Sequence, residues 1–288
     1  MSGMRHEFRV TVGPVGFRIG SDWAGPLDAM RRLYSGYPAP GIPDFTVRLA
    51  AQRPWRRFIR PSVMIGGDFM LPDAAPMALA HGLLAAEMGM NLQMALGQRR
   101  HLLLHASAVE RDGRALLMTG LSGAGKSTLS ALLGERGWRF MGDEFALLDP
   151  ESGLVHPFPR MVSLKNEAIG QFGGVVDPAR LGPVMTGTPK GTIRHLRPPD
   201  DAIARMAEPA VPALLLFPRF GHDPAVREIG EAELFVRLTQ ASTNYVALGE
   251  TGFTALTRLI ETVPCRALDY ADTDTAVDMV ETLWGELA

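Results

Sequence analysis

The chain has 288 residues, which is enough for one large domain or two small ones. Hydrophobic residues make up 46% and charged residues 21%, so the composition predicts a packed globular core. The net charge of −2 provides no overall positive field, and we expect neither nucleic acid nor a membrane as a partner. The single cysteine, Cys265, excludes an internal disulfide. The N-terminus lacks an apolar signal core. Together with the single cysteine, this favours a cytoplasmic protein.

The first hundred residues predict a mixed α/β module. Apolar runs at residues 8–12 and 15–19 flank Gly13-Pro14 and predict a hairpin, and residues 45–49 alternate like a strand. Residues 76–97 have a helical pattern that would begin after a cap at Asp73 and end at Gly97. Its apolar stripe has i, i+4 spacing and comprises Ala80, Leu84, Met88, Leu92 and Leu96.

An arginine-rich segment lies inside this module. Arg53, Arg56, Arg57 and Arg60 surround Trp55 and Phe58. Such a cluster can bind nucleic acid or an acidic partner, but a solvated strand face is the commoner reason for it. We therefore expect a surface strand at this position.

Two further apolar runs, at residues 101–109 and 115–119, are joined through Asp112-Gly113. Asp-Gly between strand-like runs predicts a hairpin, so the second strand should pair antiparallel with the first. A helix is expected over residues 127–135, and a short strand at 138–141 should end in Asp143-Glu144.

The chain becomes rich in Gly and Pro beyond residue 150. Residues 172–199 contain few apolar runs, which predicts a long loop, and long loops in compact domains are often functional. Strands are expected at residues 211–217 and 267–270. Helices are expected at 232–240, 252–263 and 274–287.

The segment between the predicted hairpin and the next helix satisfies the phosphate-loop spacing GxxxxGK[ST] in full. Glycines let the backbone wrap a phosphate, and the following helix adds its positive N-terminal end. Lys126 would reach the β and γ phosphates, and Ser127 would bind Mg²⁺. The sequence therefore predicts binding of ATP with Mg²⁺. The expected contacts are Gly120, Ser122, Gly123, Ala124, Gly125, Lys126, Ser127 and Thr128.

Candidate catalytic residues flank this loop on both sides. His105 lies in the predicted hairpin, and Asp143-Glu144 lies at a strand end sixteen residues after Ser127. Adjacent acids at a strand end beside a phosphate loop can hold Mg²⁺ and orient a nucleophile. A phosphate loop alone does not distinguish kinases from motors or switches. These flanking residues favour a kinase.

A family resemblance covers these pieces. His105-Ala-Ser, the phosphate loop, and Arg136-Gly-Trp-Arg-Phe-Met-Gly-Asp-Glu144 resemble the catalytic domain of HPr kinase/phosphorylase over about residues 101–170. The chain more broadly resembles the group called HprK-related kinase A. The further matching segments are Phe45-Thr-Val, Glu87-Met-Gly-Met-Asn91, Ser163-Leu-Lys-Asn-Glu167, Thr188-Pro-Lys-Gly191, His195-Leu-Arg-Pro198 and Asn244-Tyr.

The resemblance implies an α/β fold of the phosphoenolpyruvate carboxykinase-like type over residues 99–288, preceded by a small α/β module at 1–98. It implies that Asp143 is the base toward a serine hydroxyl and that His105 supports its carboxylate. Ser127, Glu144 and Glu167 would then hold the metal. The opposite assignment, with Glu144 as base and Asp143 on Mg²⁺, stays open. Ser163-Leu-Lys-Asn-Glu167 replaces the family's Glu-Ile-Arg-Gly-type signature, which puts the phosphorylase reaction and HPr as substrate in doubt.

The three lysines of the chain, Lys126, Lys165 and Lys190, all lie between His105 and His195. Lys190 occupies a flexible basic turn that could close over the phosphates as a lid, and we assign it a catalytic role. No role follows for Lys165.

The leading expectation is a serine kinase acting on a peptide or small protein. Through the resemblance, this activity would belong to ribosomal-peptide tailoring and would involve a peptide-chaperone protein. The alternatives are a small-molecule kinase acting on a free serine-like compound and a non-catalytic ATP-dependent peptide-binding protein. The N-terminal module is expected to recognise the substrate or partner, and the resemblance also leaves a homo-oligomer open.

Overall fold

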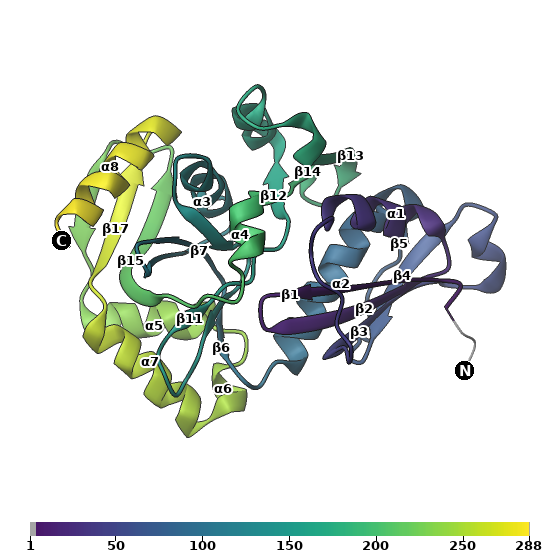
Figure 1. Cartoon of the computed structure of the whole chain (residues 1–288), viewed down its shortest axis with the longest axis horizontal. Coiled ribbons are helices and arrows are strands. Elements are labelled where there is room, and N and C mark those ends of the chain that lie inside the picture. Colours follow the sequence, from purple (N-terminus) through teal and green to yellow (C-terminus); the bar gives the residue numbers. More distant parts are fainter. Residues whose placement is uncertain (1–3, 288) are drawn as a thin grey trace. The chain divides into compact units, whose positions relative to one another are not determined.

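A computed structural model describes residues 4–287, which divide into two compact units (Figure 1). The first unit contains the residues up to 98 and residues 163–197, and the second contains residues 99–162 and those from 198 onward. The expected boundary after residue 98 recurs. Residues 163–197, expected in the catalytic domain, instead join the first unit. They are held there by contacts such as His81 Nε2 with the Thr186 carbonyl at 2.9 Å.

The first unit is built on a sheet with the order β1-β2-β3-β4-β5. Its strands are β1 (His6–Val12), β2 (Val15–Ser21), β3 (Phe45–Ala51), β4 (Ser62–Gly67) and β5 (Met77–Ala78). The hairpin of β1 and β2 confirms the prediction, and β2 then pairs with β3 in parallel. Helix α1 (Ala24–Leu33) contacts β1 and β2, while α2 (Gly82–Gly97) covers β3 and β4.

Helix α2 begins later than the sequence predicted. Met77 pairs with Val63 of β4, so the segment after Pro76 is a short strand. A 3-10 turn, η2 (Leu79–His81), follows, and His81 rather than Asp73 precedes the helix. The expected stripe was also partly wrong, because Met88 is 46% exposed. The arginine-rich segment is likewise not a strand, since residues Pro54–Arg57 form the 3-10 helix η1.

Residues 163–197 contain a sheet with the order β12-β14-β13, and two of its strands lie within residues 172–199, where a long loop was expected. Its strands are β12 (Val162–Lys165), β13 (Leu181–Thr188) and β14 (Gly191–Leu196), and the 3-10 helices η3 (Asn166–Phe172) and η4 (Pro178–Arg180) lie between β12 and β13. β13 and β14 pair antiparallel with register shifts after Leu181 and Met185. These irregularities, together with the Gly and Pro content, explain why the sequence pattern resembled a loop.

The second unit contains a six-stranded sheet with the order β16-β17-β15-β8-β7-β9. The strands are β7 (Ala106–Arg111), β8 (Arg114–Thr119), β9 (Arg139–Gly142), β15 (Val211–Phe220), β16 (Ala225–Glu228) and β17 (Cys265–Tyr270). β8, which leads into the phosphate loop, pairs antiparallel with β7, as predicted, and parallel with β15. A second sheet joins β11 (Val155–His156), β10 (Ala146–Leu148) and β6 (Leu102–Leu104).

Both faces of β8 are buried, as expected for a central strand covered by helices on each side. Ala115 and Leu117 belong to a core shared with helices α5 (Glu231–Ala241) and α7 (Glu250–Thr262). Helix α3 (Lys126–Glu135) contacts β7, β8 and β9, and also contacts α8 (Thr273–Gly285) (Figure 1). The remaining helices are α4 (Asp200–Ala204) and α6 (Tyr245–Leu248).

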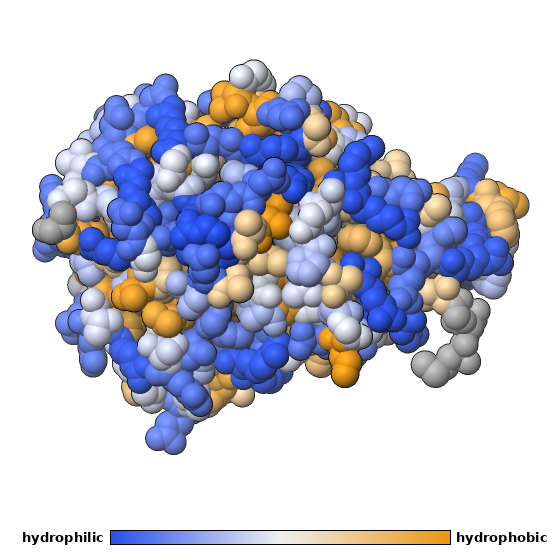
Figure 2. All heavy atoms as spheres, in the orientation of Figure 1, coloured by the Kyte–Doolittle hydropathy of each residue, from blue (hydrophilic) through white to orange (hydrophobic). Residues whose placement is uncertain are grey.

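Within residues 4–287, no helix combines the length and the apolar character that crossing a membrane requires. On the face drawn in Figure 2, hydrophobic residues are interspersed with hydrophilic ones.

Candidate phosphate-binding and catalytic site

The predicted phosphate loop lies between β8 and α3. Gly120, Gly123 and Gly125 all have positive φ angles, of 144°, 85° and 91°. Side chains disfavour this backbone region, so the glycines of the motif allow the loop to turn tightly. Gly125 directly precedes α3, so the loop ends at the positive N-terminus of a ten-residue helix. The loop therefore has the backbone form that a phosphate-binding site requires.

Lys126 is only 7% exposed, and its ammonium is directed back onto the loop. Nζ donates hydrogen bonds to the carbonyls of Gly120 at 2.7 Å and Leu121 at 2.9 Å. These carbonyl oxygens hold the positive charge beside the backbone that would surround the phosphates. The ammonium is thus placed to exchange carbonyl partners for phosphate oxygens.

Tyr270, at the end of β17, supports the loop from outside the motif. Its hydroxyl donates a hydrogen bond of 3.1 Å to the Ala124 carbonyl. A Cβ atom at Gly125 would lie 2.1 Å from this hydroxyl, so a side chain there would displace the tyrosine. Burial raises the pKa of Tyr270 well above its usual range, so the hydroxyl remains a proton donor. Sequence reasoning missed this residue because β17 is far from the loop in the chain.

The carboxylate of Asp143 lies against the loop and is 3% exposed. Its Oδ1 accepts hydrogen bonds from Ser127 Oγ at 3.0 Å and from Ser107 Oγ at 2.6 Å. Ser107 is fully buried in β7, and the sequence analysis assigned it no role. Asp143 and Ser127, the serine predicted to bind Mg²⁺, are therefore direct neighbours.

His105 contacts Glu144 rather than Asp143. Its Nδ1 lies 3.0 Å from the backbone carbonyl of Glu144 and 3.6 Å from the carboxylate oxygen Oε2. The backbone of His105 is fixed by its amide, which bonds to the Ala241 carbonyl, and by its carbonyl, which accepts from Thr119 Oγ1. The resemblance implies that His105 supports Asp143, whereas in this structure its ring lies beside Glu144. β7 begins after His105, and the strand instead directs Ser107 toward Asp143.

Glu144 has a left-handed backbone with a φ of 73°. A non-glycine residue in this region costs about 1–3 kcal/mol, and such residues concentrate at functional sites. Its side chain is 28% exposed and that of His105 is 43% exposed, whereas Asp143 is buried. Of the two acids, Glu144 is therefore the one that solvent can reach.

A buried ion pair joins β9, the strand that leads to Asp143 and Glu144, to its neighbour β7. Arg139 of β9 donates to Glu110 of β7, and both side chains are only 2% exposed. Arg139 also bonds to the carbonyls of Arg205 and Glu208. Burial is the largest influence and acts to raise the pKa of Glu110. The hydrogen bonds from Arg139 and the Gly113 amide, together with the charges of Arg139 and Arg205, outweigh it, so this pKa lies below its usual range.

The remaining predicted residues, Lys165, Glu167 and Lys190, belong to the first unit. Lys190 lies in the turn between β13 and β14, which Thr188 closes by donating to the Gly191 carbonyl at 2.7 Å. The side chain of Asn166 accepts from the Thr192 amide at 3.0 Å, so η3 and this turn are joined. Glu167 follows Asn166 in η3 and is part of the same local structure.

The residues around the loop fit a magnesium–nucleotide complex. Mg²⁺ prefers hard oxygen ligands, and phosphate loops supply them through a serine or threonine and a strand-end aspartate. Ser127 and Asp143 are such a pair, with their oxygens 3.0 Å apart.

No family model matches this chain, and no curated protein sequence matches it. Among solved structures, the HPr(Ser) kinase/phosphatase from Coxiella burnetii aligns with 64% of this chain and with 94% of its own chain. The sequence identity is 15% and the TM-score is 0.29. The likeness between the two structures is distant.

Proposed function

We propose that this protein is an ATP-dependent kinase that transfers the γ-phosphate to a hydroxyl, most simply that of a serine in a peptide or small protein. The observation that carries the proposal is the hydrogen bond between Ser127 and Asp143 beside the His105–Glu144 pair. A phosphate loop alone would suit any nucleotide-binding protein. A kinase also needs a group that accepts the proton of the hydroxyl. Glu144, an accessible carboxylate beside His105, can act as that group.

The two acids have different environments, which favours a division of roles. Asp143 is buried against Ser127, which suits a metal-binding carboxylate. When bound, Mg²⁺ would neutralise part of the phosphate charge through these two residues. Glu144 is more accessible and has His105 beside it, which suits the base. This assignment is the reverse of the one that the family resemblance implies.

In this mechanism the acceptor oxygen forms a bond to the γ-phosphorus while the bond from phosphorus to the β–γ bridging oxygen breaks. The hydroxyl proton passes to the Glu144 carboxylate, and ADP is the leaving group. The transition state is loose, so positioning contributes more than proton removal. Lys126, the loop amides and the N-terminus of α3 would hold the phosphates during this step.

The roles of the first unit are also proposals. We infer that it recognises the acceptor, because it presents exposed apolar residues next to arginines: Trp55, Phe58 and Ile59 are 46%, 75% and 62% exposed. Lys190 would bind phosphate oxygens, and Glu167 would add a metal ligand. The phosphoenolpyruvate carboxykinase-like fold, the peptide-chaperone partner and a homo-oligomer belong to the same proposal.

Transfer of ³²P from γ-labelled ATP tests the activity, with peptides encoded by neighbouring genes, cell lysate and free serine as acceptors. A peptide acceptor labelled by the wild type, but not by Lys126→Met, is the expected result. Label in free serine alone would indicate the small-molecule kinase. ATP binding without transfer to any acceptor, together with nucleotide-dependent peptide binding, would indicate the non-catalytic alternative.

A further inference from the structure

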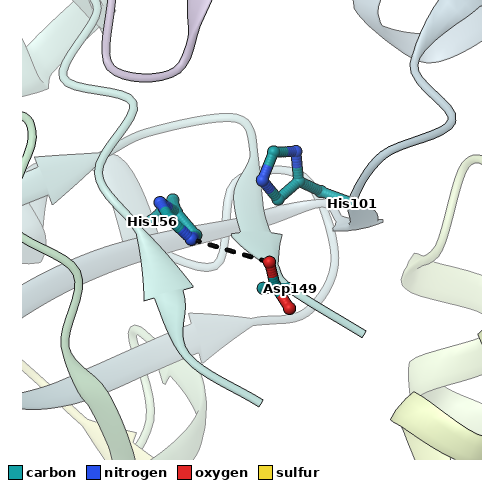
Figure 3. Close-up of side chains that lie close together, drawn as sticks. All are labelled: His101, Asp149 and His156. Atoms are coloured by element: carbon teal, nitrogen blue, oxygen red, sulfur yellow. Dashed lines mark ion pairs between the residues drawn. The ribbon is translucent and has the colours of Figure 1, made fainter. Parts of the chain in front are cut away.

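A second cluster of metal-binding side chains lies in the second unit, outside the phosphate site. His101, Asp149 and His156 each offer one ligand atom, and these atoms all lie within 4.8 Å of one another (Figure 3). His156 Nε2 is 3.9 Å from Asp149 Oδ2, and the two imidazole rings are 5.1 Å apart in an edge-on arrangement. No other group of three or more His, Cys, Asp or Glu side chains in residues 4–287 meets the same distance.

The pairing of three strands creates this cluster. In the sheet β11-β10-β6, Leu148 of β10 pairs with Leu102 of β6, and Leu147 pairs with His156 of β11. His101 and Asp149 are the next residues beyond the Leu102–Leu148 pair. Since side chains alternate between the faces of a sheet, residues 101, 149 and 156 share one face. The cluster is thus built by the fold from residues spread over the sequence.

Two of the three members have contacts that fix their position. Asp149 Oδ1 accepts from the amides of Glu151 at 2.9 Å and Ser152 at 2.8 Å, and Oδ2 is the oxygen nearer His156. Asn244 donates to the His101 carbonyl at 2.8 Å and accepts from the Leu103 amide at 2.9 Å, which fixes the start of β6. Asp149 and His101 are therefore held in position by the backbone contacts around them.

The His101 side chain provides an independent observation. The residue is 6% exposed, and its Nδ1 is buried without a hydrogen-bond partner within the described residues. An imidazole buried with a polar atom unpartnered is costly, and a bond from its other nitrogen to a metal ion is one way to offset that cost. In Figure 3 the His101 ring projects toward Asp149 and His156.

We propose that His101, Asp149 and His156 form a binding site for a divalent transition metal of the Zn²⁺ type, with three protein ligands and an open coordination position. Two imidazoles and a carboxylate suit such metals, whereas Mg²⁺ prefers oxygen ligands alone. Three protein ligands plus water is the arrangement of open zinc sites. The side chains of Asp149 and His156 are 30% and 27% exposed, so one side of the site can admit an ion and a water.

Binding requires a modest contraction. Ligand atoms around a tetrahedral Zn²⁺ with bonds of about 2.0–2.1 Å lie about 3.3 Å apart. The ligand atoms now lie within 4.8 Å of one another, with His156 Nε2 and Asp149 Oδ2 3.9 Å apart, so rotations of the partly exposed Asp149 and His156 side chains would close the site. Such closure would connect β6, β10 and β11 through one ion. The site is separate from the proposed Mg²⁺ position, because the three-residue strand β10 lies between Glu144 and Asp149.

The test is a Zn²⁺ titration of the full-length, chelator-treated protein against a chromophoric chelator, with the thermal midpoint and the Co²⁺ visible spectrum as second readouts. One equivalent should bind, raise the midpoint and persist in millimolar Mg²⁺. Asp149→Asn keeps an acceptor for the turn, and His156→Ala changes a partly exposed side chain, so both variants should fold. Each should weaken Zn²⁺ binding tenfold or more, since losing even an outer-shell partner costs about 10–100-fold.

His222→Ala, which removes an exposed histidine of the same unit, is the matched control and should bind like the wild type. Zn²⁺ binding of unchanged affinity in both Asp149→Asn and His156→Ala would overturn the proposal. So would the absence of stoichiometric binding by the wild type. Neither result depends on nucleotide binding or kinase activity, so this inference and the proposed function can fail separately.

Discussion

The Ser127 hydroxyl donates a 3.0 Å hydrogen bond to the Asp143 carboxylate, which links the phosphate loop directly to the acid pair after β9. Because Asp143 contacts Ser127 and Glu144 does not, we expect different kinetic effects when each acid is replaced. Asp143→Asn should raise the Mg²⁺ concentration required for activity. Glu144→Gln should leave ATP·Mg²⁺ affinity within a few-fold and lower kcat by about 10²–10⁴, the usual contribution of a positioned base.

Steady-state kinetics at several Mg²⁺ concentrations separate these outcomes. His105→Asn should resemble Glu144→Gln in its effect on kcat, because His105 contacts Glu144. If Asp143→Asn instead lowers kcat with unchanged Mg²⁺ dependence, Asp143 is the base and the assignment made from the contacts is wrong.

Nucleotide binding should depend on Lys126. Its ammonium offsets phosphate charge, and Lys126→Met keeps most of the buried volume while removing that charge. ATP·Mg²⁺ at a hundredfold excess over Kd should stabilise the wild type by about 2.7 kcal/mol and the variant far less. Differential scanning fluorimetry measures this shift, with Arg258→Ala on the exposed side of α7 as a control. If ATP·Mg²⁺ raises the thermal midpoint of Lys126→Met as much as that of the wild type, the assignment of this loop as the phosphate-binding site is wrong.

Tyr270 should contribute to nucleotide affinity through the loop backbone. Tyr270→Phe removes the hydrogen bond to the Ala124 carbonyl and keeps the ring packed against Phe220, so about 0.5–1.5 kcal/mol should be lost. Isothermal titration with ATP·Mg²⁺ should show that part of this loss appears as weaker binding. Tyr245→Phe in the same unit is the matched control. Unchanged affinity together with lower stability would mean that Tyr270 supports the fold alone.

The buried Glu110–Arg139 pair should make stability depend on pH. The folded-state pKa of Glu110 lies below its unfolded value, so its contribution is complete above the unfolded pKa of about 4.3 and is lost as the pH falls through the folded pKa. Glu110→Ala should cost about 3–5 kcal/mol at neutral pH, because it leaves a buried charge without its partner. Denaturant unfolding between pH 3 and 7 should show a shallower acid dependence in this variant than in the exposed control Glu286→Ala.

Lys190 should affect phosphoryl transfer more than nucleotide binding. Lys190→Ala removes a positive charge from the β13–β14 turn, and kcat should fall while the Kd for ATP changes little. Hydrogen exchange over residues 180–198 should slow when ATP·Mg²⁺ and acceptor are added. Lys165→Ala, in the same unit, is the comparison. Exchange that ignores both ligands, together with a normal kcat, would exclude a lid function for this turn.

The sequence predicted the features that depend on neighbouring residues. The glycines of the phosphate loop, the helix after it and the antiparallel hairpin before it all follow from local backbone preferences, and the structure confirms the hairpin and the helix. The neighbour of His105 did not follow from the sequence, because the resemblance specifies a residue but not the direction of its side chain. Ser107, two positions along, makes the contact with Asp143 instead.

Longer-range relationships could not be predicted in this way. Tyr270 reaches the loop only through the strand order that brings β17 beside β15 and β8. The cluster of His101, Asp149 and His156 depends on the register of β6, β10 and β11. The hairpin at residues 181–196 was mistaken for a loop because its stabilising partners, such as His81 and Ser35, lie about a hundred residues or more earlier in the chain.

The interrupted course of the first unit constrains how the chain can fold during synthesis. Its last part, residues 163–197, emerges from the ribosome only after a large part of the second unit has been made. Residues 4–98 therefore cannot complete their unit until residues 163–197 have been synthesised. These 35 residues also interrupt the second unit, which is complete only after the residues that follow them have been made. Folding limited by such distant pairings is expected to be slow. Cutting the gene at residue 98 would separate the two parts of the first unit, so a fragment that reproduces that unit would need residues 163–197 joined to it by a linker.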